Sequence, residues 1–222
     1  AASACGIPAE NILIAATHTH TAASPAGLLG TPRADEYMDA LPAKIADSIV
    51  RAVARLQPAK WGAALGHEER LSFNRRFRMR DGSVQMNPGF NNADAIECVG
   101  PIDPDVPVLH VVNVETGATI ALLANFALHY VGGSPGDVAS ADYFGMFGRE
   151  VAKWLGGDPV VALANGFCGD INNVDVTRRP TRTGPWEHAE HVARLLAMNV
   201  LALVEQMDYS EDGKLRVARE TL

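Results

Sequence analysis

The stretch VPVLHVVNVETGATIALLANFALH, residues 106–129, determines the fold that we predict for this chain. Its first half alternates strictly, so that one face of an extended chain carries Val106, Val108, His110, Val112 and Val114. Residues 115–117, Glu-Thr-Gly, are typical of a turn, and a second apolar run follows at residues 119–128. The pattern predicts a β-hairpin whose second strand leads directly into His129.

Short apolar runs and amphipathic helices alternate along the rest of the chain. Asp81 and Gly82 fold one ribbon back on itself, and Pro42 marks a kink or a restart in the first long helix. We predict helices at residues 35–56, 142–155 and 186–207, and further strands at residues 12–17, 61–69, 75–86, 159–164 and 214–221.

Hairpins beside helix-linked strands favour an α/β fold, with a mixed β-sheet core that contains hairpins and is flanked by helices. The chain has 222 residues, of which 47% are hydrophobic, which is enough for one well-buried core. We therefore expect residues 1–222 to form a single α/β catalytic-type domain.

Composition excludes several classes of partner. The formal net charge is -7, and the basic clusters at residues 75–80 and 178–182 lie in expected loops or ribbons rather than along a helix face, so no nucleic-acid partner is expected. The longest apolar stretches fall short of the roughly 20 residues of a membrane-spanning helix, so no transmembrane segment is expected. The 3 cysteines offer neither a disulfide framework nor a paired-thiol metal site.

Polar residues follow three of the expected strands. His18-Thr19-His20 follows the run at residues 12–17, His129 follows the hairpin, and residues 165–173 follow the strand at residues 159–164. Ligands of open α/β sheets bind beyond the carboxyl ends of the strands, where such loops converge. We predict that these three strand endings form one site.

The histidine pair suggests metal and proton chemistry. In an extended chain, His18 and His20 would point to the same side, about 6–7 Å apart, because side chains alternate along a strand. That spacing is wide for two ligands of one small cation, although a turn after the strand would close it. One ring can therefore bind metal while its neighbour transfers protons.

For several other residues with reactive side chains, a purely structural role stays open as well as a functional one. Asp170 fits a turn or cap position, and Cys168 fits a small apolar residue. The remaining histidines fit core, surface or helix-face positions: His67, His110, His188 and His191.

Several segments together resemble the neutral/alkaline non-lysosomal ceramidase family. Residues 6–20 resemble the segment of that family that ends in Thr-His-Thr-His, and the small residues and the proline that follow this motif are also present. Further matches come in the order of the family: Phe73-Asn74-Arg75-Arg76, Asn87-Pro88, residues 125–129, residues 140–143 and residues 169–172. The resemblance spans nearly the whole chain.

The resemblance implies a zinc-dependent hydrolase that cleaves the amide bond of N-acyl sphingoid lipids or related N-acyl substrates. It makes His18 and His129 zinc ligands, His20 a proton-transferring residue that faces the substrate, and Arg75 a group on the substrate side. A Zn²⁺ cofactor polarises a carbonyl or lowers the pKa of a bound nucleophile. A secreted or periplasmic location follows from the resemblance alone, contact with a membrane surface stays open, and so does the oligomeric state.

One departure from the family pattern concerns the nucleophile. The family carries a serine within Gly-Asp-x-Ser-Pro, whereas residues 169–173 read Gly-Asp-Ile-Asn-Asn. Asparagine cannot be acylated as serine can, so we expect attack by a metal-activated water, with Asn172 stabilising an oxyanion or positioning that water. Asp170 and Asn172 complete the set of catalytic candidates with His20 and Arg75.

A second departure concerns the metal shell, which the family completes with a glutamate and a tyrosine from later in the chain. The sequence ends at Leu222 inside an expected strand, so we interpret it as an internal fragment without the true N-terminus and the C-terminal part. We expect such a fragment to hold zinc loosely, since zinc sites use three or four protein ligands.

Three other functions stay open. A barrel-type metal-dependent amidohydrolase also carries His-x-His after its first strand, but that fold needs eight strand–helix units and about 250 residues. A cysteine hydrolase would use Cys168 with a histidine. A non-catalytic metal- or lipid-binding relative with a degenerate site would explain Asn172.

Overall fold

A computed structural model of the chain describes residues 2–28, 30–213, 216–218 and 220. Its helices are α1 (Ala2–Cys5), α2 (Asp35–Ala54), α3 (Asp142–Leu155) and α4 (Glu187–Val204), with a 3-10 turn at Ala9–Asn11. Its strands are β1 (Ala59–His67), β2 (Phe73–Asn74), β3 (Arg76–Met79), β4 (Val84–Met86), β5 (Ala95–Cys98), β6 (Asp105–Asn113), β7 (Thr119–Phe126), β8 (Val160–Asn165) and β9 (Ile171–Asn172). This combination confirms the predicted α/β class. The strand predicted at residues 214–221 falls mostly outside the described residues.

The central sheet contains the hairpin predicted from the sequence. Its strand order is β1-β6-β7-β8, and β6 pairs with β7 in antiparallel register, with Val108 opposite Ala124. The turn between the two strands includes Gly117, whose φ of +70° is readily adopted only by a residue without a Cβ atom. The alternating valines of β6 pack inward because the strand has one buried and one open face.

Strands β7 and β8 are parallel and are connected through α3. Phe126 at the end of β7 lies opposite Asn165 at the end of β8. The chain segments that follow both strands therefore leave the sheet at the same edge, as predicted for the strand endings. This parallel pair places His129 beside the loop that follows β8.

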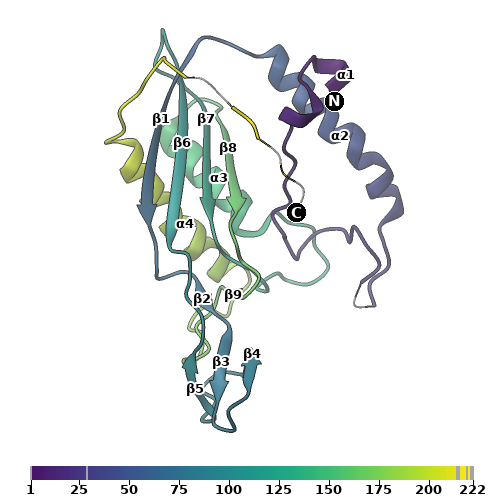
Figure 1. Ribbon diagram of the computed structural model, residues 1–222, viewed down its shortest axis with the longest axis vertical. Helices are drawn as coiled ribbons and strands as arrows, with labels where there is room; N and C mark the ends of the chain where they lie inside the picture. The colour runs from purple at the N-terminus through teal and green to yellow at the C-terminus, as the bar shows by residue number, and fades with distance from the viewer. Residues whose placement is uncertain (1, 29, 214–215, 219, 221–222) are drawn as a thin grey trace.

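One face of the central sheet is covered by α3 and α4 (Figure 1). The core between them contains Phe126 from β7, Phe147 from α3 and Leu196 from α4, each fully buried. Alternate residues of the strands point to the opposite face, where Leu65 is 63% exposed and Leu123 is 45% exposed. The sheet is thus packed on one side within the described residues.

Two smaller sheets extend from one end of the central sheet (Figure 1). One has the order β4-β3-β5, and its β3–β4 hairpin turns at Asp81-Gly82, as predicted. The other is the short pair β2–β9, in which Phe73 lies opposite Asn172. This pair connects the smaller β4-β3-β5 sheet to the loop after β8.

The strand predicted at residues 12–17 is wrong. The segment is irregular, and Leu13 and Ile14 are 92% and 62% exposed. An apolar run becomes a strand only when a neighbouring strand accepts and donates its backbone hydrogen bonds, and among the described residues none pairs with this segment. Hydrophobicity alone could not reveal the missing partner.

The first long helix also differs from expectation. α2 continues through Pro42 as one helix, and none of its residues is buried, although its apolar spacing predicted a packed face. Figure 1 shows α1 and α2 beside the central sheet rather than on its covered face. Spacing identified the helix but not what it packs against.

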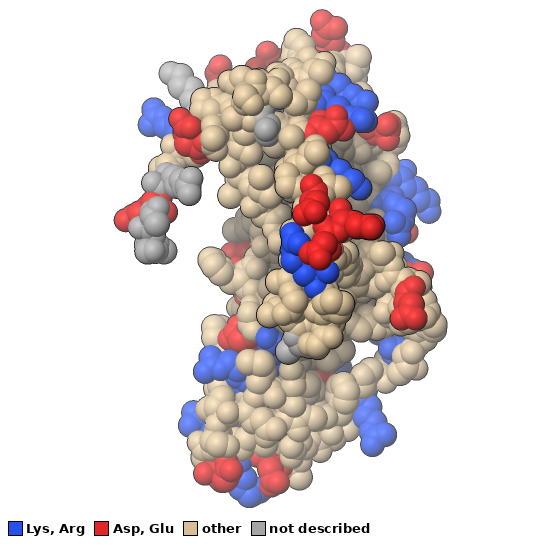
Figure 2. Space-filling model, turned by 90° about the vertical axis from the view of Figure 1, so that its right-hand side faces the viewer, with Lys and Arg blue, Asp and Glu red and all other residues tan. Residues whose placement is uncertain are grey.

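The surface around α2 carries both signs of charge. Figure 2 shows acidic and basic side chains interspersed with uncharged residues over this face. Among the described residues, no helix combines the length and the apolar character that crossing a membrane requires.

Candidate metal centre

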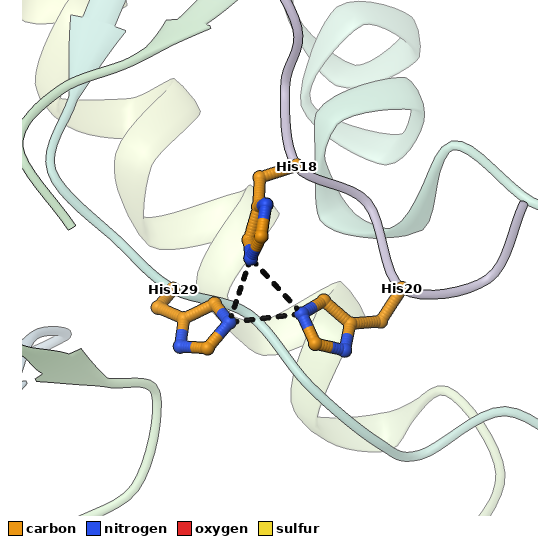
Figure 3. A group of neighbouring side chains, drawn as sticks. All are labelled: His18, His20 and His129. Carbon is orange, nitrogen blue, oxygen red and sulfur yellow. Dashed lines mark hydrogen bonds between the residues drawn. The ribbon is translucent and has the colours of Figure 1, made fainter. Parts of the chain in front are cut away.

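Three histidine rings meet at the edge of the sheet where β7 and β8 end (Figure 3). The Nε2 atom of His18 lies 3.1 Å from that of His129 and 3.2 Å from that of His20. The third side of the triangle, between the Nε2 atoms of His20 and His129, measures 2.9 Å. The same ring nitrogen of each histidine thus points to a common centre.

The triangle has the size of one face of a metal coordination shell. Zinc binds histidine nitrogens at about 2.0–2.1 Å, which places the nitrogens of a tetrahedral site about 3.3 Å apart. Hydrogen bonds alone cannot satisfy three converging ring nitrogens, because each pair needs one donor and one acceptor and one pair must mismatch. The donor set and spacing therefore fit a divalent cation such as zinc.

A backbone turn at His18 brings the first two rings together. His18 has φ of +60°, in the left-handed region that is uncommon for residues other than glycine. This turn replaces the extended conformation in which the rings would lie about 6–7 Å apart. His20 consequently reaches the same centre as His18, whereas the sequence pattern suggested separate metal and proton roles for the two rings.

Three hydrogen bonds hold the histidine segment against the sheet edge. The Thr19 hydroxyl donates to Asp142 Oδ2 over 2.5 Å, and the Ser140 N–H donates to the Thr21 carbonyl over 2.7 Å. Asn165 Nδ2 donates to the Thr17 carbonyl over 3.2 Å. The segment is irregular, so these contacts substitute for the strand pairing that it lacks.

Asn165 also fixes the other half of the centre. While its amide nitrogen contacts Thr17, its Oδ1 accepts a hydrogen bond of 3.2 Å from the Leu128 N–H. Leu128 immediately precedes His129. One side chain at the end of β8 therefore aligns both segments that supply the histidines.

Arg75 contacts the far side of the His129 ring. Its Nη1 lies 2.9 Å from His129 Nδ1, and its Nη2 donates to the Gly169 carbonyl. A guanidinium can only donate, so Nδ1 accepts, and in this arrangement the proton of a neutral His129 sits on Nε2. Metal binding through Nε2 requires that proton to leave. The hydrogen bond from Arg75 to Nδ1 therefore opposes metal binding by this ring.

Burial and nearby positive charge favour the neutral forms of His20 and His129. Burial, followed by the charge of Arg75, lowers the pKa of His129 to about 4. Burial, followed by His18, lowers the pKa of His20. A neutral ring carries one lone pair, so at neutral pH neither ring is protonated on both nitrogens. In His129 the contact with Arg75 places this lone pair on Nδ1, so binding through Nε2 still requires the Nε2 proton to leave.

The other predicted site residues, Asp170 and Asn172, lie outside the histidine cluster. Asp170 Oδ2 accepts a hydrogen bond of 2.8 Å from Asn74 Nδ2, and its carbonyl accepts from the Arg75 N–H. Asn172 Nδ2 donates to Asn87 Oδ1 over 2.6 Å. No hydrogen bond within the described part of the chain joins Asp170 or Asn172 to the three histidines.

The residues for which a purely structural role stayed open in the sequence analysis lie outside the histidine cluster. His110 is buried between the Tyr209 hydroxyl and Thr119, and His188 donates to the Asn173 carbonyl. Cys168 accepts a hydrogen bond from Asn165, and among the described residues no imidazole is hydrogen-bonded to its sulfur. A cysteine–histidine pair is therefore not formed here, and the open four-stranded sheet excludes an eight-stranded barrel for the described residues.

Sequence reasoning missed the residues that position the cluster. Asp142 was identified only as part of a motif before a helix, and Asn165 only as a polar residue after a strand. Their partners, Thr19 and Thr17, are distant in the sequence, so no local pattern could pair them. The position of Asn165 at a strand end was the one available signal.

The fold and the histidine cluster define an α/β structure with a candidate metal centre. No model of a known protein family matches the sequence, and no curated protein matches it. A solved structure described as a ceramidase complexed with C2 shares the fold, with a TM-score of 0.64 and 20% identity over 86% of this chain. The neutral ceramidase from Pseudomonas aeruginosa is similar over 79% of this chain, with a TM-score of 0.54 and 21% identity.

This likeness extends to part of each ceramidase. The chain spans 30% of the length of the first structure and 26% of the second. The particular fold is therefore that of a region found in ceramidases.

Proposed function

We propose that this chain forms the metal-binding part of a hydrolase that cleaves the amide bond of N-acyl lipids, with zinc as the metal. The observation that carries the proposal is the triangle of Nε2 atoms, whose sides measure 2.9–3.2 Å. The fold shared with ceramidase structures, one of them complexed with C2, supports the N-acyl substrate class.

The three histidines would hold the cation through Nε2 and leave room for further ligands. Zinc bound in this way supplies Lewis acidity toward a carbonyl oxygen and lowers the pKa of a coordinated water. The cluster meets solvent on the side of the N-terminal segment, where His18 and His20 are exposed while His129 is 8% exposed. The ring to which we assign proton transfer is that of His20. Its transfer of a proton to the leaving amine stays part of the proposal.

Arg75 provides a fixed positive charge at the rim of the cluster. Its guanidinium is held from two sides, by His129 Nδ1 and by the Gly169 carbonyl. A charge positioned in advance stabilises the negative charge that develops on an amide oxygen during attack. We assign Arg75 to this substrate-side role.

Water is the nucleophile in this proposal. Asn172 cannot form an acyl intermediate, and its amide is directed to Asn87. Asn172 therefore supports the loop beside the centre, and an acylated protein trapped by quenching during turnover would contradict direct attack by water.

A non-catalytic metal-binding relative is the second candidate, and two contacts favour it. Arg75 donates to His129 Nδ1, which opposes metal ligation, and Asn172 occupies the position of the family's serine. In that case the chain binds metal but turns over no substrate.

Metal analysis of the protein, followed by a panel of N-acyl substrates with and without chelator, tests both candidates. Zinc in the purified protein with chelator-sensitive amide hydrolysis supports the enzyme. Zinc binding without hydrolysis of any substrate supports the non-catalytic relative. Hydrolysis that resists the chelator but is lost after thiol alkylation would contradict both.

A further inference from the structure

A cavity lies beside the metal centre, and its lining does not include the three histidines of that centre. Its volume is about 470 Å³, and one wall is formed by residues 130–133, which directly follow His129. Residues 178–184 also line it, together with His188 and His191 near the start of α4. The cavity has the volume of a pocket for a small molecule.

The cavity is positively charged. Four arginines line it: Arg70, Arg178, Arg179 and Arg182. Arg70 pairs with Glu68, and Arg178 pairs with Asp175 over 3.0 Å. Within the described part of the chain, no salt bridge joins Arg179 or Arg182 to a carboxylate.

The single carboxylate in the lining is already engaged. One oxygen of Asp175 faces Arg178, and the other accepts hydrogen bonds from the Thr177 N–H and hydroxyl. It therefore cannot neutralise the two remaining guanidiniums. Two positive charges are left for a ligand.

A buried hydroxyl adds an independent observation. Tyr130 lines the cavity and is 3% exposed, and its hydroxyl has no hydrogen-bond partner among the described residues. Burial raises the pKa of Tyr130, so the hydroxyl keeps its proton and can donate. A buried donor without a partner is costly, and a ligand oxygen would satisfy it.

Gly132 and Gly133 leave space next to this hydroxyl. Both have positive φ, and a Cβ atom at Gly133 would lie 3.4 Å from the Tyr130 hydroxyl oxygen. Side chains here would be strained and would narrow the approach to that oxygen. The glycine pair thus keeps the inner wall open.

The two histidines in the lining contribute hydrogen bonds rather than charge. Burial lowers the pKa of His188, and burial followed by the charge of Arg182 lowers the pKa of His191. His188 stacks on Tyr130 with ring centroids 5.9 Å apart and donates to the Asn173 carbonyl. The positive charge of the cavity therefore comes from the arginines.

We propose that this cavity binds the phosphate group of a small phosphorylated molecule or of a lipid headgroup. The two guanidiniums come from the segment at residues 178–184 and the hydroxyl from the segment that follows β7. Three such donors suit a tetrahedral group with several oxygens better than a planar carboxylate with two. The volume accommodates more than the phosphate alone, so part of the attached molecule also enters.

Binding of inorganic phosphate to the full chain, measured by titration calorimetry, tests the site. The double variant Arg179→Gln/Arg182→Gln is expected to bind phosphate at least about tenfold more weakly, the effect of one lost hydrogen bond to a charged group. The matched control, Arg51→Gln/Arg55→Gln at the C-terminal end of α2, removes the same charge elsewhere and should bind unchanged.

Tyr130→Phe removes only the buried hydroxyl and is expected to weaken phosphate binding several-fold. Circular dichroism checks that each variant is folded. The proposal would be overturned if the α2 control weakened binding equally or if the double variant bound unchanged. It would also be overturned if the unaltered chain bound in neither the phosphate nor the vesicle measurement.

A second measurement distinguishes the source of the phosphate. Cosedimentation with phosphatidylcholine vesicles that contain phosphatidic acid, compared with phosphatidylcholine alone, reports headgroup binding, whereas calorimetry reports free phosphate. Loss of either signal in the double variant supports the site. Neither readout requires hydrolysis, so a failure here is distinct from a failure of the proposed amide hydrolase.

Discussion

Thr19 donates a hydrogen bond of 2.5 Å to Asp142, a residue 123 positions away in the sequence. Thr19 separates the two histidines of the N-terminal segment, and Asp142 is the first residue of α3. Asp142 is 2% exposed and has φ of +48°, a backbone region that aspartate adopts more often than most residues other than glycine. A buried carboxylate thus fixes the segment that turns His18 and His20 inward.

The first prediction concerns this contact. Thr19→Val keeps the shape of the side chain but removes the donor, so we expect zinc affinity to fall about tenfold, as when the outer contacts of a metal site are lost. Isothermal titration with zinc measures it. Thr21→Val is the control, because Thr21 takes part in the described hydrogen bonds through its backbone carbonyl; a similar loss in both variants would contradict a positioning role.

The second prediction separates the two roles of His20. His18→Ala, His20→Ala and His129→Ala should each lower zinc affinity by more than about 100-fold, since each removes one of three direct ligands. His67→Ala serves as control, because that ring is 60% exposed and lies outside the cluster. If His20→Ala abolishes hydrolysis but leaves zinc affinity unchanged, His20 transfers protons and is not a ligand.

The third prediction concerns the competition between Arg75 and the metal. Arg75→Met removes a positive charge and a donor 2.9 Å from His129 Nδ1, so zinc should bind about tenfold more tightly. Hydrolysis should fall at the same time, because the charge for the developing oxyanion is lost. Arg76→Met, an exposed neighbour, should change neither property. Weaker zinc binding by Arg75→Met would show that Arg75 supports the metal site instead.

The fourth prediction concerns the stability of the β6–β7 hairpin as pH changes. Burial lowers the pKa of His110 from 6.5, so this ring takes up a proton less readily in the folded than in the unfolded chain. Its contribution to stability is therefore full above pH 6.5 and is lost as pH falls through the folded-state pKa.

Chemical denaturation at several pH values tests this pH dependence. The free energy of unfolding of His110→Gln should depend less steeply on pH below 6.5 than that of the unaltered chain. Identical curves for the unaltered chain and His110→Gln would contradict the assignment.

Local patterns predicted the elements that bury a regular face. The alternation over residues 106–114, with the turn at Gly117, predicted β6 and β7, and the helical spacing before Gly156 predicted α3. These patterns succeed because a strand or helix that packs on one side repeats its apolar residues with the period of its own geometry. Residues 12–17 show the limit, since a short apolar run carries no sign of whether a partner strand exists.

The site was partly predictable in the same way. His18 and His129 were predicted to share one centre, and the structure brings them together although 111 positions separate them. His20 reaches the same centre because the backbone of His18 is left-handed, and the sequence does not show this conformation. The places of Asp170 and Asn172 beside β2 were likewise set by the pairing of β2 with β9.

The sequence by itself determined the hairpin, the helices and the histidines that follow apolar runs, because each depends on neighbouring residues. Only the tertiary structure decided which ring nitrogens converge and, among the described residues, which arginines have no carboxylate partner and which hydroxyl is buried without a hydrogen bond. Those properties depend on distances between segments, which are set when β7 and β8 align in parallel and Asn165 joins the two loops at their ends.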